Sequence, residues 1–339
     1  MFVFIVRRVL ISIPLIFVVM IGLFFLQQLA PGDASALYIN PEFPIEQIER
    51  IRANLGLDQP SYVQFWRWFT AALSGDFGIS LTENRPVIDK IIAALPNTLL
   101  LGGASLAVIF VIGIVVGVVS AVKQYSLTDH LLTLGSFFLY SMPGFWLALM
   151  LILVTFHLWP DWPSSGMVSN EITMKLAHIR EAAMLGEEPE VSIGMFERFF
   201  DTLKHLVLPV IALGVASAAS IARYTRSSVL EVIRQDFVRT ARAKGVSERR
   251  VILVHTLRNA LIPIVTLLGL SLPFLVSGAV LIEYVFAWPG MGRELVEGIF
   301  KRDYPIVMAC ALLLTIMVFV GNLAADILYS LVDPRISHG

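Results

Sequence analysis

The stretch Asp236-Phe-Val-Arg-Thr-Ala-Arg-Ala-Lys-Gly245 lies inside a basic segment, Arg223 to Arg258, between two long apolar runs. Its basic residues alternate with small ones, and it ends in glycine, the residue most often found just past the last turn of a helix. We expect a short amphipathic helix that lies across the mouth of a membrane-embedded bundle. There it would offer a soluble protein a surface to grip.

The rest of the chain is unusually apolar. Of its 339 residues, 57% are hydrophobic, and the mean hydropathy is +0.78, far above that of an ordinary soluble domain. A bilayer core of about 30 Å takes about 20 helical residues to cross, and six runs qualify without containing one charged residue or histidine. They are Val9–Leu29, Thr98–Val122, Leu131–Phe156, Leu206–Ala222, Ile262–Ile282 and Pro305–Ala325. We therefore predict an all-α membrane protein with six transmembrane helices.

The first run has an alternative interpretation as a secretion signal, because Arg7 and Arg8 precede it and small residues follow from Ala30 to Ala36. Its uninterrupted length of 21 residues exceeds the apolar core of about 7–15 residues that is usual in a signal. We expect a retained span.

Basic residues concentrate in the loops that remain in the cytoplasm. If the N-terminus is inside, the inner segments hold 13 basic and six acidic residues, and the outer segments hold 12 basic and 20 acidic residues. The inner side then carries +7 and the outer side −8, so six spans place both termini in the cytoplasm.

Three regions follow from this layout. Residues 1–30 form the N-terminal tail and first span, residues 31–96 an outer helical region, and residues 97–339 the core with the other five spans. The core has an outer insert at 160–204 and an inner loop at 223–262.

The region 31–96 has two helical patterns. One carries Ile45, Ile48, Ile51 and Leu55, and the other runs from Ser61 to Ser74. The second is rich in aromatic residues, which favours an aromatic belt at the membrane surface; a platform for an outer partner is the alternative.

In the inner loop, apolar residues recur every four positions at Val229, Ile233, Phe237 and Ala241, which predicts one shared helical face. Gly245 then ends this helix, Ser247 caps a second one, and Pro263 opens the next span. Binding to anionic lipid is the alternative for so basic a helix. The small residues Thr240, Ala241, Ala243 and Gly245 favour close docking in a protein groove.

Two sequences interrupt the spans. Pro143-Gly144 removes a backbone donor within the third run and predicts a kink, which is either a packing device or the bend of a gate. Trp288-Pro-Gly-Met-Gly292 predicts a turn and a short outer helix at Arg293–Lys301. Glu283, at the top of the fifth span, is expected to be exposed, either as a solvated helix-end acid or as a contact for a substrate ammonium. The candidate gate or pathway residues are Tyr140, Met142, Pro143, Glu283 and Trp288.

No catalytic or metal site is expected. The single Cys310 excludes a disulfide within the chain, and the six histidines are scattered without ligand spacing. The charge-free runs offer neither the acids nor the histidines that an intramembrane protease would need, and they lack the coupling residue of an ion-driven carrier. No phosphate-binding Gly-x-x-x-x-Gly-Lys-Ser/Thr sequence occurs, so any energy from ATP must come from another subunit and no cofactor is expected here.

Nearly the whole chain resembles the permeases of ATP-binding-cassette importers, in the peptide and nickel branch and closest to dipeptide-permease B subunits. The inner loop matches their coupling loop at Thr240–Gly245 and Leu257–Pro263. It departs from the general pattern because Arg239 replaces a glutamate and Pro263 lies farther from Gly245. Supporting motifs are Arg7-Arg8, Pro31–Asp33, Leu55–Asp58, Gly75–Ser80, Tyr140–Pro143, Arg226–Ser228, Phe286–Gly292, Arg302–Pro305 and Asp333–Ile336.

The resemblance implies the type I importer fold in a bacterial inner membrane. It implies a second related permease, two cytoplasmic ATP-binding subunits that hold ATP and Mg²⁺, and an extracytoplasmic solute-binding protein. The substrate would be di- or oligopeptides, with nickel complexes or oligosaccharides as alternatives. The coupling residues would be Asp236, Arg239, Thr240, Ala241, Arg242, Ala243, Lys244 and Gly245.

Overall fold

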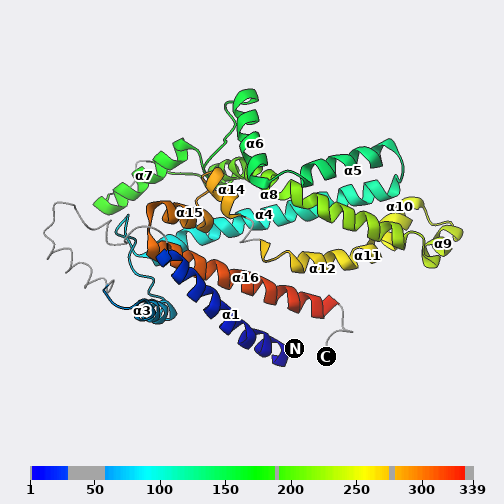
Figure 1. The fold of residues 1–339 in the computed structure, drawn as a ribbon. Coiled ribbons are helices and arrows are strands. Elements are labelled where there is room, and N and C mark those ends of the chain that lie inside the picture. Colours follow the sequence, from blue (N-terminus) through cyan, green and yellow to red (C-terminus); the bar gives the residue numbers. More distant parts are fainter. Residues whose placement is uncertain (1, 30–57, 188–190, 275–278, 333–339) are drawn as a thin grey trace.

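The computed structural model describes residues 2–29, 58–187, 191–274 and 279–332 (Figure 1). Within these ranges the regular elements are helices, accompanied by a single β-bridge between Ile79 and Pro86. The all-α prediction is confirmed. The helix expected around Ile45–Leu55 and the motifs at 31–33 and 333–336 lie outside the described residues.

Four helices are long and apolar enough to cross a membrane, and they confirm four of the six predicted spans. Each extends beyond its apolar run, because polar residues at a helix end reach water outside the hydrocarbon. They are α1 (Phe2–Leu29), α4 (Val87–Val122), α8 (Met195–Val232) and α16 (Tyr304–Val332).

The third apolar run is not one straight helix. It divides into α5 (Leu127–Tyr140) and α6 (Gly144–Leu158), whose axes differ by 105°. Pro143 has an extended backbone, with ψ 132°, and stands immediately before α6. Proline lacks the N–H that a continuing helix needs and disfavours helical geometry in the residue before it. The interruption predicted at Pro143 is confirmed.

The fifth apolar run is also broken, so one continuous helix over 262–282 is wrong. The helical segment from Glu248 to Ala260 meets α12 (Ile262–Leu270) at 45°, with Pro263 at the start of α12. Helix α12 ends before Ser271 and Pro273, and α14 (Val280–Val285) follows. The described residues therefore give six spans only if each bent pair counts as one.

Short helices occupy the two ends of the long ones (Figure 1). Helices α3, α7 and α15 lie where α4 begins, whereas α9 lies where α4 ends. The start of α1 and the end of α16 lie away from α3 and α7, below α12 in this view. The cytoplasmic location of both termini stays a prediction. The bounds are α3 (Ser61–Leu73), α7 (Asn170–Leu185), α9 (Asp236–Ala243) and α15 (Met291–Lys301).

Helix α3 confirms the second helix predicted in the outer region. Its Phe65 is buried against α1, with ring centroids 5.7 Å from Phe17 and 5.4 Å from Phe24. Tyr62 and Trp66 remain exposed. Part of the aromatic face is thus packing against α1, and the exposed part is compatible with both the membrane belt and the partner platform.

Helices α4 and α8 form the centre of the bundle. At Gly117 the two backbones approach so closely that an added Cβ atom would lie 2.6 Å from both the Ala222 carbonyl oxygen and Thr225 Cβ. At Gly113 it would lie 2.6 Å from Ile221 Cβ. Side chains larger than hydrogen would force the helices apart, so these glycines set the interhelical distance.

Gly117→Val is expected to destabilise the fold by about 1–3 kcal/mol, because overpacking displaces α8 from α4. Gly103→Val is the matched control in the same helix, since no atom lies within 4 Å of an added Cβ there. Thermal unfolding of the detergent-purified variants, followed by size-exclusion chromatography, measures the difference. Equal unfolding temperatures would contradict the close-packing argument.

Candidate functional site

The predicted inner helix exists as α9, but it is not continuous with α8. The chain leaves α8 at Val232, turns, and enters α9 after Gln235, whose ψ is 154°. The single face predicted from Val229 through Phe237 to Ala241 is therefore wrong: the turn resets the helical phase, and Phe237 is exposed. A four-residue repeat of apolar residues in the sequence does not reveal that an extended residue separates two helices.

Helix α9 is anchored by a small apolar cluster. Val238 and Ala241 are buried against Val251 of η2 (Val251–Thr256), with Ile233 and Val246 packed around them. The π-helical segment η2 continues from α10 (Glu248–Arg250) and leads through α11 (Leu257–Ala260) to α12. One short helix thus contacts the segments leading to two different spans.

Gly245 ends α9 as predicted. Its φ is +78°, a left-handed conformation that costs glycine little and other residues more. The Gly245 N–H donates to the Arg242 carbonyl at 2.9 Å and the Val246 N–H to the Ala241 carbonyl at 3.2 Å. Ser247 precedes α10 as predicted, but no hydrogen bond from its side chain caps that helix.

The remaining predicted coupling residues form the exposed surface of α9 and its C-terminal turn. Asp236 and Arg239 have side chains 95% and 71% exposed. Arg242 pairs with Glu248 at 2.7 Å, which fixes the turn that follows the helix. Thr240, Ala243 and Lys244 are also exposed. This surface is charged, accessible and held on a buried anchor, as a docking helix requires.

A partly buried ion pair joins α8 to α5 near the same end. Arg226 donates from Nε to Asp129 Oδ1 at 3.0 Å and from a terminal nitrogen to Oδ2 at 2.9 Å. The Ser120 hydroxyl and the Tyr125 N–H also donate to this carboxylate, which is 4% exposed. The pair holds α8 against both α4 and α5.

Sequence reasoning missed this ion pair. Asp129 occupies the first turn of α5 and follows the N-cap Ser126, whose side chain accepts from its N–H. That spacing is typical of a local cap, and nothing in it identifies a partner 97 residues away. The ionisable residues also lie beyond the apolar runs, in the extensions that lengthen the helices.

The bend at Pro143 connects to this region through α5. Tyr140, the last residue of α5, is exposed, and its ring lies 4.8 Å from the guanidinium carbon of Arg223. Met142 is half-buried and Pro143 is exposed. The structure places these three residues at one bend; their role in a gate stays a prediction.

Glu283 and Trp288 lie near the opposite end of the bundle and are both fully buried. The expectation that Glu283 is exposed is wrong, because the following turn folds back over it. Its Oε2 accepts from the N–H groups of Gly292 at 2.7 Å and Arg293 at 3.3 Å, at the start of α15. Trp288 donates from Nε1 to the Asn97 carbonyl at 2.9 Å. Both residues hold the turn between α14 and α15 in place.

Burial raises the pKa of Glu283 to about 6, while hydrogen bonds from Thr98, Gly292 and Arg293 act in the opposite direction. Glu283 lies one residue beyond the fifth apolar run, Ile262–Ile282.

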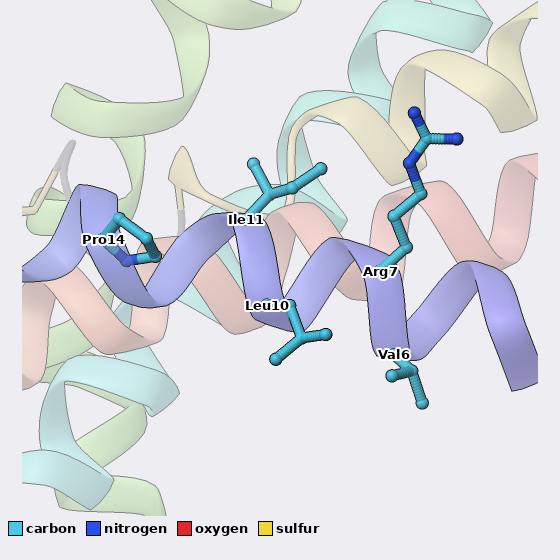
Figure 2. A pocket seen from close by; sticks show the side chains of 5 residues that line it. All are labelled: Val6, Arg7, Leu10, Ile11 and Pro14. Carbon is cyan, nitrogen blue, oxygen red and sulfur yellow. The ribbon is translucent and has the colours of Figure 1, made fainter.

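A hollow of 670 Å³ lies on the surface of α1 and is lined by Val6, Arg7, Leu10, Ile11 and Pro14. Figure 2 shows that these side chains leave the helix in different directions. They do not converge on one ligand, so this apolar surface has no features of a substrate site.

The chain matches two family models. The model for the inner membrane component of binding-protein-dependent transport systems matches residues 113–338, and the model for the N-terminal part of such components matches residues 1–102. The chain belongs to this permease family. The apolar helices and the family together make it a multi-pass inner-membrane protein.

Relatives that match over their full length support the same family. The permease is 39% identical over 336 residues to the oligopeptide transport system permease protein AppB of Bacillus subtilis, covering 99% of both chains. It is 38% identical to the dipeptide transport system permease protein DppB of Escherichia coli K12, covering 99% of this chain and 98% of that one. It is 37% identical to the E. coli K12 glutathione transport system permease protein GsiC, covering 99% of each. The family resemblance expected from the motifs is confirmed.

Asp129→Asn is expected to destabilise the permease by about 1.5–3 kcal/mol, because it removes the charge-assisted hydrogen bonds to Arg226, which is 31% exposed and can still reach water. Glu248→Gln, which breaks the exposed pair with Arg242, should cost less than about 1 kcal/mol. Thermal unfolding of the two purified variants tests the contrast. Similar losses in both would show that Asp129 is not a structural clamp.

Glu283→Gln is expected to change the pH dependence of stability. The folded-state pKa of about 6 exceeds the usual 4.5, so the wild type loses stability as the pH rises from about 4.5 to about 6. This loss amounts to roughly 2 kcal/mol. The variant keeps the oxygen acceptor without the charge, so it should gain stability relative to the wild type over that interval. Unfolding midpoints of the wild type and the variant, measured at several pH values, test this. A difference between the two that does not change with pH would contradict the raised pKa of Glu283.

Proposed function

We propose that the permease is one of two membrane subunits of an ATP-driven importer of peptides. The observation that supports this most directly is the geometry of α9: a charged exposed surface on a buried anchor, in contact with the segments leading to two spans. A force applied to this surface would displace α8 and the helices before α12 together. Relatives named for oligopeptide, dipeptide and glutathione transport support peptides as the substrate.

The energy source in this proposal is a pair of ATP-binding subunits on the cytoplasmic side. They would hold ATP and Mg²⁺, and this chain would hold no cofactor or metal. The other membrane half would be a second related permease, and a solute-binding protein would deliver the substrate from outside. Docking residues would be those exposed on α9 and its turn, with Arg239 at the centre.

Nickel complexes and oligosaccharides remain alternative substrates, and an ion-coupled carrier is the alternative from another class. Uptake into proteoliposomes containing the full complex distinguishes them. Labelled dipeptide should accumulate with ATP and the binding protein and not with a proton or sodium gradient alone. Accumulation driven by the gradient without ATP would refute the proposal, and uptake of nickel complexes in place of peptide would correct the substrate.

A cross-linking prediction tests the docking surface. In a Cys310→Ser background, Arg239→Cys should be joined to an ATP-binding subunit by a short bifunctional thiol reagent, because its side chain is 71% exposed on α9. Tyr62→Cys is the matched control, because this residue is 70% exposed on α3 at the other end of the bundle. Denaturing electrophoresis and mass spectrometry identify the products. If Arg239→Cys captures no ATP-binding subunit in a complex that still transports, α9 is not the docking helix.

A further inference from the structure

Arg223 is the first charged residue after the apolar part of α8, and its side chain is exposed. Its guanidinium carbon lies 5.3 Å from the ring centroid of Phe137 and 4.8 Å from that of Tyr140, both on α5. Stacking on aromatic rings uses the faces of the planar guanidinium and leaves its N–H donors, which lie in the plane, available. The rings thus orient the guanidinium group but do not accept hydrogen bonds from its N–H donors.

Arg226, one turn further along α8, provides the contrast. Its charge is neutralised by two hydrogen bonds to Asp129. Among the described residues, by contrast, the ion pairs with carboxylates do not include Arg223. Of two arginines on the same stretch of helix, one is a structural clamp and the other keeps an uncompensated positive charge at the end of an apolar span. Its position at the end of the span leaves this charge available to an anionic group that enters between the helices.

Two hollows between the spans meet the stacked rings. One, of 440 Å³, is lined by Arg223 and Phe137 together with hydroxyl groups of Thr133, Ser136 and Ser227. The other, of 390 Å³, is lined by Tyr140 and adds the hydroxyls of Ser217, Ser220 and Ser271. Hydroxyls can donate to and accept from amide groups, and the surrounding apolar side chains suit varied substrate side chains.

We infer that Arg223, oriented by Phe137 and Tyr140, binds the C-terminal carboxylate of a peptide in transit. This inference rests on the proposed function. A carboxylate matches the fork of N–H donors in two parallel hydrogen bonds, which is stronger and more directional than contact with a neutral group. The hydroxyl-lined hollows on either side would then accommodate the rest of a short peptide.

The test compares a dipeptide with its C-terminal amide, which lacks the carboxylate. In proteoliposomes with the complete complex, Arg223→Gln should slow ATP-driven uptake of the free acid about tenfold, the effect of one lost charge-assisted interaction, and slow the amide much less. Lys123→Gln removes an exposed basic residue just after α4 and should change neither rate. Equal slowing of acid and amide would overturn the inference and assign Arg223 to structure.

A second measurement does not depend on delivery by the binding protein. In the same complex, Cys310→Ser with Ser136→Cys places a thiol in the hollow beside Arg223. Millimolar free dipeptide should slow maleimide labelling of this thiol, and neither the amide nor the Arg223→Gln variant should show that protection. The inference is overturned if the dipeptide does not protect the thiol when Arg223 is present, or if the free acid and the amide protect it equally.

Lipid phosphate is the competing anion for Arg223. If the effect of Arg223→Gln disappears when anionic lipid is omitted from the vesicles, the residue binds lipid and the inference fails. If the unaltered complex imports no peptide, the proposed function fails first. If the unaltered complex imports peptide but Arg223→Gln slows the free acid and the amide equally, only the carboxylate site is refuted.

Discussion

The close approach of α4 and α8 at Gly117 determines where the other functional parts lie. An added Cβ atom there would meet the backbone and side chain of α8 at 2.6 Å, so the two helices cannot separate or rotate freely without losing this fit. Arg226, whose backbone nitrogen lies 3.0 Å from the same added Cβ atom, pairs with Asp129 and so adds α5 to the same rigid unit. Any displacement of the end of α8 that leads to α9 must therefore include α4 and the start of α5.

This rigid unit is bounded by two breaks in the helices. Between α8 and α9, the turn before Asp236 changes the chain direction, and between α5 and α6 the axes differ by 105° at Pro143. Rigid helices transmit displacement, and breaks allow it to change direction. The arrangement places the exposed surface of α9 at one end of the unit and the bend at Tyr140 and Pro143 at the other. Coupling and gating residues predicted separately thus lie on one connected path.

The sequence predicted the class of fold, the four straight spans, the break at Pro143 and the glycine end of α9, because each depends on local hydropathy or backbone chemistry. It failed where tertiary contacts decide. Glu283 is a helix-end acid by position, and only the fold brings the N–H groups of Gly292 and Arg293 over it. Asp129 has the spacing of a local cap, and its pairing with Arg226 spans 97 residues. The prediction of one apolar face through Phe237 failed because an extended residue before α9 changes the direction in which the side chains of that helix point.

The absence of charge from the apolar runs did not reveal the roles of the two arginines at the end of α8. Arg226 and Asp129 neutralise each other within a network that includes Ser120 and Tyr125, and a saturated pair of this kind is poorly suited to carry protons. The six apolar runs themselves contain no charged residue or histidine, in line with the proposed energy source on other subunits. Arg223 has no such partner among the described residues, and its rings orient it without neutralising it. A fixed charge next to hydroxyl-lined hollows can select a substrate but cannot supply energy, so selection and driving force would reside on different subunits.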